Sequence, residues 1–524
     1  MTSPRPRLLL INPTYGATFW GLDYAVGLAG ASTTIAPLAL ATIAGLSPQD
    51  WDIRIADENV EPIDLDEPCD IVGITAMNVQ AARAFELAAA FRKRGRLVVI
   101  GGPFATLQPE RCAAHADVLV VGEAERIWPE FCADYVALKV RSRYVEEAPM
   151  DLALSPTPRY DLFRRGAYSA LPIQTTRGCP FGCEFCDIII MQGRKVRAKP
   201  IPNVLAEIDA IGRAGGRSVF VTDDNFIGSP KIAKALLAAM TAHSAKTGYA
   251  PPLFTQASVN LSEDPELLRA MVRAGFTRVF LGIESPRQSS LREAGKRQNV
   301  RGVLLDQIHT IQRAGLMVWA GMIVGFDHDD DAIFGEQADF LDAAGIAVAM
   351  IGMLNAPPRT PLYTRLAVAG RIHATADWAD NCAWTNIVPM TMSRSRLFEG
   401  YADLLKHVYT RERYASRVLA NIERMEPAPK TDAAGRWPAL RDLGDFGRAA
   451  LAYSTTLGDL SYFGPNVLRI LRQNPTRMVE GTIHLSLWRH FERYVPEVTA
   501  KISQAARSER ASVAPHLTTP ALAA

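Results

Sequence analysis

Short apolar runs alternate with helix-length segments through two long stretches of this chain, and this alternation constrains the fold more than any other feature. In residues 7–135 the runs are apolar on both faces, which is typical of parallel strands covered by helices on two sides. The sequence therefore predicts a doubly wound, Rossmann- or flavodoxin-like α/β domain over residues 1–140. Its predicted strands are residues 7–12, 52–56, 71–75, 97–101 and 118–122.

The alternation resumes after a charged, proline-bearing stretch at residues 141–165, which we interpret as a linker. Six further strand–helix units predict a partial (β/α)6 barrel of the TIM type over residues 166–393. In such barrels the active face lies at the carboxyl ends of the strands. The predicted strands are residues 173–176, 218–222, 253–257, 278–283, 318–324 and 347–352.

The last part of the chain reads as a helical C-terminal domain over residues 394–506. The predicted helical stretches are residues 397–409, 414–425, 446–457 and 467–471. Aromatic residues are dense near its end, which favours an amphipathic bundle with an aromatic core. A cap over an apolar substrate or a surface resting on a membrane are the alternatives. Residues 507–524, rich in Ala, Ser, Pro and Thr, predict a disordered tail.

Charge and composition exclude several classes of function. The net charge of +2 and the lack of any long Lys or Arg run give no electrostatic reason to expect a nucleic-acid partner. No stretch approaches the roughly 20 apolar residues needed to span a bilayer, and the first residues lack the pattern of a signal peptide. Seven cysteines without such a signal are typical of a reducing compartment. We expect a cytoplasmic protein, with peripheral membrane contact as the alternative.

A loop after the first barrel strand carries the strongest chemical signal. Cys179, Cys183 and Cys186 are separated by three and then two residues. Soft thiolate ligands suit iron–sulfur centres, and this short spacing fits three irons of a cubane cluster. The spacing therefore predicts a [4Fe-4S] cluster whose fourth iron has no cysteine ligand.

Other cysteine sites explain the loop less well. A structural zinc site would normally show a second cysteine pair or regularly spaced histidines. A four-cysteine ferredoxin run would show another cysteine, followed by proline, a few residues on. The remaining cysteines are instead single and scattered: Cys69, Cys112, Cys132 and Cys382.

The order of several motifs resembles the core of the radical S-adenosylmethionine (SAM) enzymes. Residues 170–365 carry the cysteine loop, the pair Asp223 and Asp224, the run 280–285 and a glycine-bearing strand at 321–325. The preceding sheet resembles a cobalamin-binding domain. The stretches 282–286, 295–299 and 355–361 are similar to the subset of cobalamin-dependent radical SAM enzymes that includes the hopanoid C-2 methylases.

This resemblance implies that SAM chelates the open iron and contacts the ends of the barrel strands. An aspartate carboxylate after the second strand could accept hydrogen bonds from the SAM ammonium, and Glu284 could accept them from the ribose hydroxyls. Helix capping by Asp224 or Asn225 is a compatible alternative. The predicted SAM-binding residues are Phe185, Asp223, Asp224, Ser258, Glu284, Gly321 and Gly325.

The strand ends of the first sheet are the expected site for cobalamin. Ligands of doubly wound sheets bind beyond the carboxyl ends of the strands, and paired glycines there let a large flat ligand approach the backbone, although tight packing also favours them. The predicted cobalamin-binding residues are Thr14, Thr75, Gly101, Gly102, Gly122 and Glu123.

One feature departs from the familiar cobalamin module, in which an Asp-x-His-x-x-Gly turn supplies a histidine to cobalt. The corresponding turn at residues 57–60 has no histidine, and His115 is the only histidine of the first predicted domain. We therefore expect cobalamin to bind without a protein histidine on cobalt. The same feature also permits a sheet domain that no longer binds cobalamin.

The function implied by the resemblance is methylation of an unactivated carbon. A ferredoxin or flavodoxin would reduce the cluster, SAM would yield a 5′-deoxyadenosyl radical, and the substrate radical would take a methyl group from methylcobalamin. The protein would position the reactants and exclude water and oxygen. No catalytic residue is predicted beyond the cluster.

Two other functions stay open. A radical SAM cyclase or oxidoreductase, acting on a tetrapyrrole or another natural product, would form deoxyadenosine without methyl transfer. A non-catalytic iron–sulfur or cobalamin sensor is the second, although no pair of DNA-binding helices is recognisable. The resemblance favours a small apolar substrate such as a hopanoid lipid.

Overall fold

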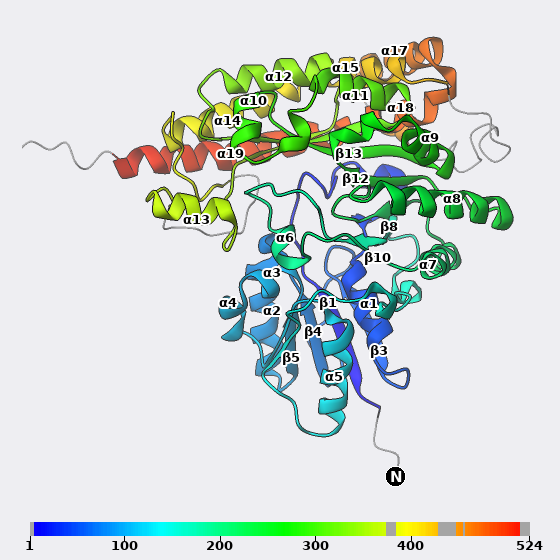
Figure 1. Ribbon diagram of the computed structural model, residues 1–524, viewed down its shortest axis with the longest axis vertical. Helices are drawn as coiled ribbons and strands as arrows, with labels where there is room; N and C mark the ends of the chain where they lie inside the picture. The colour runs from blue at the N-terminus through cyan, green and yellow to red at the C-terminus, as the bar shows by residue number, and fades with distance from the viewer. Residues whose placement is uncertain (1–4, 374–383, 428–446, 454–455, 514–524) are drawn as a thin grey trace, which may run out of the picture.

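The computed structural model describes residues 5–373, 384–427, 447–453 and 456–513. The N-terminal α/β part lies at one end of the molecule, and the second sheet with the C-terminal helices lies at the other (Figure 1). In the described part of the chain, no helix is long and apolar enough to cross a membrane.

Six parallel strands form the first sheet, in the order β3-β1-β4-β5-β6-β7. Five of them match the predicted strands, so the doubly wound fold is confirmed. The sixth, β7, lies in the segment predicted as a linker, where buried Tyr144 anchors it. The strands are β1 (Arg7–Asn12), β3 (Asp52–Asp57), β4 (Ile71–Thr75), β5 (Leu97–Gly101), β6 (Val118–Val121) and β7 (Arg143–Val145).

Helices cover both faces of this sheet because successive side chains of each strand point to opposite faces. Leu8 and Leu10 of β1 belong to the same core as Trp128, whereas Leu9 and Ile11 belong to a second core with Phe91. The first face carries α1 (Leu38–Leu46) and α5 (Ala124–Val136). The second carries α2 (Ala81–Lys93), α3 (Pro103–Leu107) and α4 (Pro109–Ala113).

Seven parallel strands form the second sheet, a curled half-barrel in the order β15-β14-β13-β12-β11-β8-β2. The predicted partial barrel is confirmed. The strands are β2 (Thr33–Ile35), β8 (Tyr168–Ile173), β11 (Val219–Val221), β12 (Leu253–Ala257), β13 (Phe276–Glu284), β14 (Met317–Val324) and β15 (Ala349–Met353).

Two features of the half-barrel differ from the sequence-based expectation. The first strand was predicted at residues 173–176, but β8 ends at Ile173. The next residues leave the sheet because Thr175 and Thr176 hydrogen-bond Asp223. The short strand β2 was not predicted. In the chain it lies between β1 and β3 of the first sheet, but it pairs with β8 of the half-barrel. It covers the edge of β8 and links the two sheets.

The half-barrel keeps its outer face buried under helices and its inner face partly open. Along β12, Thr255 is fully buried, whereas the alternate residues Phe254 and Gln256 keep some exposure. The outer helices are α7 (Ile201–Arg213), α8 (Pro230–Thr247), α9 (Pro265–Ala274), α11 (Leu304–Arg313) and α12 (Ile333–Ala344). The remaining elements are the ribbon strands β9 (Thr176–Arg177) and β10 (Arg197–Ala198) and the short helices α6 (Ile188–Met191), α10 (Gln288–Glu293) and α13 (Pro361–Val368).

The C-terminal helices form the predicted bundle with an aromatic core. Tyr409 and Phe491 stack with ring centroids 4.2 Å apart, and Tyr462, Trp488 and Tyr494 are buried. The helices are α14 (Arg394–Val408), α15 (Arg411–Arg424), α17 (Leu457–Gln473), α18 (Met478–Ser486) and α19 (Trp488–Val513). The predicted helical stretch at residues 446–457 lies partly outside the described residues.

The predicted disordered tail begins too early. Helix α19 continues to Val513, because Glu509 and Arg510 form ion pairs with Arg394 and Glu399 of α14. The rest of the predicted tail, residues 514–524, lies outside the described residues.

Candidate active site

The cysteine loop leaves the antiparallel ribbon of β9 and β10 and runs into α6. Cys183 is buried, and Cys179 and Cys186 are half-buried, all three as free thiols. The loop begins with Gly178 at φ +93°, where a Cβ atom would lie 2.5 Å from the Lys195 carbonyl oxygen, so only glycine fits. The turn therefore needs this glycine to present the three sulfurs.

The donor set fits an iron–sulfur cluster. Burial raises the pKa of Cys186 to about 12 and also raises that of Cys179, so iron would displace their protons on binding. Among the described residues, no three His, Cys, Asp or Glu side chains converge in a way that would hold a metal ion. A cubane cluster does not need such convergence, because each thiolate binds a different iron.

Asp223 and Asp224 brace the base of the loop. Asp223 is fully buried and accepts hydrogen bonds from the Thr175 backbone N–H at 2.6 Å and from the Thr176 hydroxyl at 2.7 Å. Asp224 Oδ2 accepts from the Gly178 N–H at 2.8 Å, and burial raises the pKa of Asp224 to about 6. Both carboxylates thus hold the backbone that leads into the cysteines, and their contact with SAM stays a prediction.

A second group of predicted residues meets at the end of β13. Glu284 has a left-handed backbone, with φ +68°, and its Oε1 accepts from Lys296 Nζ. Its other oxygen, Oε2, lies 3.8 Å from where a Cβ of Gly321 would stand. Lys296 Nζ also lies 5.8 Å from the centroid of the Phe185 ring. The structure therefore brings Phe185, Glu284 and Gly321 together.

Sequence reasoning missed Lys296, although it stands in the quoted stretch 295–299. Burial lowers the pKa of Lys296, but the neighbouring Glu284 carboxylate outweighs this and holds the pKa above its usual value. The ammonium is therefore charged beside the cysteine loop. Gln298, from the same stretch, points its Nε2 toward the Cys183 sulfur at 3.9 Å. The run Gly-Lys-Arg-Gln at residues 295–298 follows the strand that ends at Glu284 by ten residues, and this proximity in sequence could have indicated both residues.

The two other predicted SAM residues lie differently. Ser258 accepts from Asn225 Nδ2 at 3.1 Å and donates to Asn260 Oδ1 at 2.6 Å, which links the ends of β11 and β12. Gly325 lies at φ +106°, and a Cβ there would lie 3.2 Å from Leu397 of α14. Gly325 therefore faces the C-terminal helices, whereas Gly321 faces Glu284.

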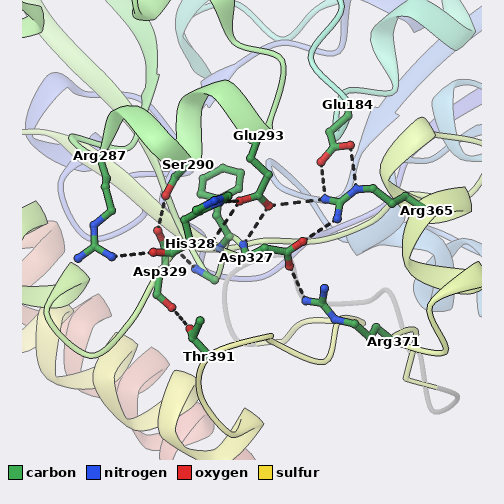
Figure 2. Close-up of polar contacts among 12 residues, drawn as sticks. Glu184, Arg287, Ser290, Glu293, Asp327, His328, Asp329, Arg365, Arg371 and Thr391 are labelled. Atoms are coloured by element: carbon green, nitrogen blue, oxygen red, sulfur yellow. Dashed lines mark hydrogen bonds and ion pairs between the residues drawn. The ribbon is translucent and has the colours of Figure 1, made fainter.

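An ion-pair network connects the cysteine loop to the end of β14. Arg365 of α13 donates to Glu184 Oε1 and to Asp327 Oδ2, both at 2.6 Å, and it lies 3.6 Å from Glu293 (Figure 2). Arg371 also pairs with Asp327. Glu184 lies between the second and third cysteines, so this network fixes the loop from the side of α13.

A cavity of about 330 Å³ lies between the carboxyl ends of the first sheet and the half-barrel. Gln174, Arg177 and Thr222 line it from the barrel side. Five of the six residues predicted for cobalamin line it from the sheet side: Thr75, Gly101, Gly102, Gly122 and Glu123. Thr14 lies elsewhere, and its backbone N–H donates to Glu58 Oε2 at 3.0 Å.

The cavity wall fits a flat, mostly apolar group. Gly102 and Gly122 both have positive φ, and a Cβ at these positions would lie 2.5 Å from Thr75 Oγ1 and 2.3 Å from the Glu146 carbonyl oxygen. The strand ends are therefore bare backbone. Leu38 and Ile43 of α1 add apolar side chains to the wall.

Histidine is absent from the described residues that line this cavity. His115 instead stacks on Phe85 with ring centroids 3.8 Å apart. In the turn at residues 57–60, Asp57 accepts from Asn12 Nδ2 at 3.0 Å and from the Tyr168 hydroxyl at 3.1 Å. Cobalamin binding without a protein histidine on cobalt stays a prediction.

Four charged side chains that are largely buried, which we call the Glu123 clamp, join the cavity to the cysteine loop. Glu123 Oε1 accepts from Arg177 at 3.0 Å, and Oε2 accepts from Arg197 at 2.8 Å and from the Met150 N–H at 2.7 Å. Arg177 also donates to Glu125 at 2.6 Å. Both Glu123 oxygens are thus engaged by protein groups. The clamp of Glu123, Glu125, Arg177 and Arg197 was not predicted, because its members are far apart in sequence.

Three family models match the chain. Residues 173–341 match the radical SAM superfamily, residues 24–131 match the B12 binding domain, and residues 360–504 match a domain of unknown function, DUF4070. These matches fall in the first sheet, in the half-barrel with its cysteine loop and in the C-terminal helices.

Curated relatives cover most of the chain. An uncharacterized methyltransferase of Synechocystis sp. is 33% identical over 96% of this chain and 94% of its own length. The hopanoid C-2 methylase of Rhodopseudomonas palustris is 30% identical over 70% of this chain and 71% of its own. The bacteriochlorophyllide d C-8(2)-methyltransferase of Chlorobaculum tepidum is 28% identical over 74% and 89%.

The fold also matches a solved structure. The radical SAM methyltransferase TsrM of Kitasatospora setae, determined with cobalamin and a [4Fe-4S] cluster bound, aligns with a TM-score of 0.62 over 96% of this chain and all of its own, at 15% identity. The sequence relatives and the family models together decide the assignment. The chain is an enzyme that belongs to the cobalamin-dependent radical SAM methyltransferase family, with a [4Fe-4S] cluster, SAM and cobalamin as its cofactors.

Proposed function

We propose that this enzyme methylates an unactivated carbon of a small apolar substrate such as a hopanoid lipid. The observation that carries the proposal is the shared cavity, because Arg177, which directly precedes the cysteine loop, lines it together with the bare strand ends of the first sheet. A group bound at those strand ends would therefore lie close to a group bound by the cysteine loop. This proximity suits a reaction that needs both cofactors.

The residues of the chain would position the reactants. When bound, the cluster and SAM supply a radical that removes hydrogen, and cobalamin supplies the methyl group. Cys179, Cys183 and Cys186 would bind the cluster, and Glu284 with Lys296 would orient SAM beside it. The Glu123 clamp would keep the loop and the cobalamin wall at a fixed separation.

The substrate class rests on similarity and on the inner face of the half-barrel. A relative at 30% identity is a hopanoid C-2 methylase, and Phe220, Phe254 and Phe280 are half-buried on the inner face. A tetrapyrrole is the second candidate, because another relative is a bacteriochlorophyllide methyltransferase. Both candidates are polycyclic and largely apolar, and either would need a ferredoxin or flavodoxin as electron donor.

Helix α17 offers a surface for reaching a substrate that resides in a membrane. Leu457, Leu460, Leu468 and Leu471 lie on one face of this helix, and Leu457 is 87% exposed. Arg472 is exposed beside them, and the one acidic residue of the helix, Asp459, is buried against Arg411 and Arg489. Exposed leucines next to arginines favour contact with an anionic lipid surface.

Anaerobic reconstitution tests the reaction. The protein is loaded with iron, sulfide and cobalamin, then given SAM, a reductant and either a hopanoid or a bacteriochlorophyllide. We expect nearly equal amounts of deoxyadenosine and S-adenosylhomocysteine, both dependent on the substrate. The matched variants are Cys183→Ala, which should abolish both products, and Cys132→Ala, a buried cysteine outside the loop, which should keep them.

Each alternative function has its own outcome in this assay. Formation of deoxyadenosine without S-adenosylhomocysteine would indicate that the enzyme catalyses a cyclisation or an oxidation and not a methylation. Neither product with any apolar substrate, despite an intact cluster, would favour a sensor and contradict the proposal.

A further inference from the structure

Arg278 is a cation on the inner face of the half-barrel. Its register partners are Phe254 on β12 and Met317 on β14, so its side chain shares their face of the sheet. It is separated from Glu284 by six residues of β13, about 20 Å along an extended strand. Arg278 therefore lies on the same inner face as the residues expected to contact SAM, but near the opposite end of β13.

Among the described residues, the Arg278 guanidinium has no acidic partner. Its Nε atom is buried without a hydrogen-bond partner. Burial lowers the pKa of Arg278 to about 10, and no neighbouring carboxylate acts to raise it. Buried cations in proteins are normally paired, because removing a charge from water without a counter-charge is costly. An unpaired guanidinium on a partly open face therefore calls for a partner from outside the chain.

Aromatic rings hold this guanidinium in place. The Arg278 Cζ atom lies 4.1 Å from the Phe254 ring centroid and 5.0 Å from that of Trp319. Phe220 stacks on Phe254 at 4.5 Å. These rings leave the edge of the planar guanidinium, with its N–H donors, as the part available for an acceptor.

Trp319 and His484, which lie beside Arg278, do not supply that acceptor. Trp319 Nε1 donates to His484 Nε2 at 2.9 Å, and His484 Nδ1 lies 2.7 Å from the Glu480 carbonyl oxygen. Burial, together with the nearby Arg278 charge, lowers the pKa of His484 to about 4, so the ring is neutral and both of its nitrogens are engaged. His484 thus fixes the Trp319 platform and leaves Arg278 unpaired.

We propose that Arg278 binds a carboxylate or phosphate group carried by the substrate, at the end opposite to the carbon that reacts. This inference rests on the proposed function and narrows its substrate to an apolar, ring-bearing molecule with one anionic end. The rings of Phe220, Phe254 and Trp319 would contact the apolar body, and the guanidinium would hold the anion in a two-pronged contact. A neutral hydrocarbon would leave Arg278 without a partner.

Calorimetric binding tests the site without any turnover. Full-length protein loaded with cluster and cobalamin, with SAM and without reductant, is titrated with a pentacyclic triterpene acid such as ursolic acid, with its methyl ester, and with inorganic phosphate. We expect the acid to bind at least about tenfold more tightly than the ester, because a charge-assisted hydrogen bond is lost on esterification. Arg278→Met should equalise acid and ester, and Arg278→Lys should keep part of the preference.

The matched control is Arg273→Met, an exposed arginine of α9 on the outer side of the sheet, which should keep the full preference. Circular dichroism and cobalamin absorbance confirm that each variant is folded and loaded. Equal binding of acid and ester by the unaltered protein, no binding of either, or a preference that survives in Arg278→Met would overturn the proposal. Tight phosphate binding with weak acid binding would also overturn it, since the site would then take a free anion.

Failure of the proposed function would look different. If the protein prefers the acid but forms no S-adenosylhomocysteine in the turnover assay, the anion site is supported and only the proposed methylation is contradicted.

Discussion

Glu123 lies at the carboxyl end of β6, where doubly wound sheets bind their ligands, yet both of its oxygens accept hydrogen bonds from protein groups. Arg177 and Arg197, from the ribbon beside the cysteine loop, donate these hydrogen bonds together with the Met150 N–H. Glu123, which was predicted to contact cobalamin, therefore links the first sheet to this ribbon. The neighbouring arginines, in turn, hold the pKa of Glu123 below its usual value although burial alone would raise it.

We expect Glu123→Gln to destabilise the protein by about 3 kcal/mol, because removing this carboxylate from a largely buried ion-pair group leaves the Arg197 charge uncompensated and leaves Arg177 with Glu125 alone. Its amide nitrogen would also face the donors of Arg197 and Met150. Urea unfolding followed by circular dichroism measures the change. The control, Glu110→Gln, removes a pair with Arg143 in which the glutamate side chain is 82% exposed, and should cost less than about 1 kcal/mol. Equal effects of the two substitutions would refute the role of the clamp.

Asp329 gives a prediction about pH. Burial raises its pKa from 3.8 to about 6, although Ser290 and the Gly325 N–H donate to it. The folded state therefore binds this proton more tightly than the unfolded state. Its contribution to stability is fully present below pH 3.8 and is lost as the pH rises to about 6, with a slope of up to about 1.4 kcal/mol per pH unit.

Asp329→Asn should remove this slope, since the amide keeps the contacts and does not titrate. The measurement compares urea unfolding of both proteins at several pH values between 4 and 6.5. The difference between the two proteins isolates Asp329 from other groups that titrate in the same range. A difference that does not change with pH would contradict the prediction.

At the scale of elements, short segments of the chain determine how the site is enclosed. The ribbon of β9 and β10 and helix α13 hold the cysteine loop from two sides, through the Glu123 clamp and through Arg365. The C-terminal aromatic residues, considered above as a candidate surface, are buried in the bundle. Helix α17 instead exposes leucines on a single face.

We expect the α17 face to bind anionic lipid. The double variant Leu468→Gln and Leu471→Gln should lose most co-sedimentation with vesicles that contain an anionic phospholipid, because the apolar contact area is removed. Leu138→Gln is the matched control, as this leucine is 91% exposed in the N-terminal part of the chain. Binding by the unaltered protein should also weaken at high salt. Vesicle binding that is equal in all three proteins would disprove the assignment.

At the scale of the whole molecule, the cavity is built from both sheets, and neither sheet alone encloses it. Strand β2 and the Glu123 clamp connect the same two parts. A ligand in this cavity would therefore stabilise both parts together. The position of the cavity, between the cysteine loop and the bare strand ends, is a property of the assembled chain.

Hydroxocobalamin should raise the melting temperature of the protein, with a stabilisation of about 2.7 kcal/mol at a free concentration 100 times the dissociation constant. Differential scanning calorimetry under argon measures this shift. Gly101→Trp should abolish it, because a Cβ at Gly101 meets only Val120 at ordinary contact distance and a larger side chain has room only in the cavity. Gly335→Trp, on the exposed side of α12, is the control. A shift that persists in Gly101→Trp would place cobalamin elsewhere.

The sequence by itself determined the features that depend on neighbouring residues. Apolar runs and their spacing predicted eleven strands, ten of them in place, because hydrophobic periodicity is local. The three cysteines predicted a cluster for the same reason, since their spacing on one turn is a local property. The lack of a histidine in the turn at residues 57–60 could also be read from one short segment.

The tertiary structure alone decided which distant residues share an environment. Thr14 stands at a predicted strand end but does not line the cavity, and a Cβ of Gly325 would meet Leu397 of α14. Lys296, Arg177 and Arg197 instead join the site from other segments. The isolation of Arg278 likewise appears only when three strands and α18 are assembled around it. Ion pairing and burial depend on contacts between residues remote in sequence, which no local pattern encodes.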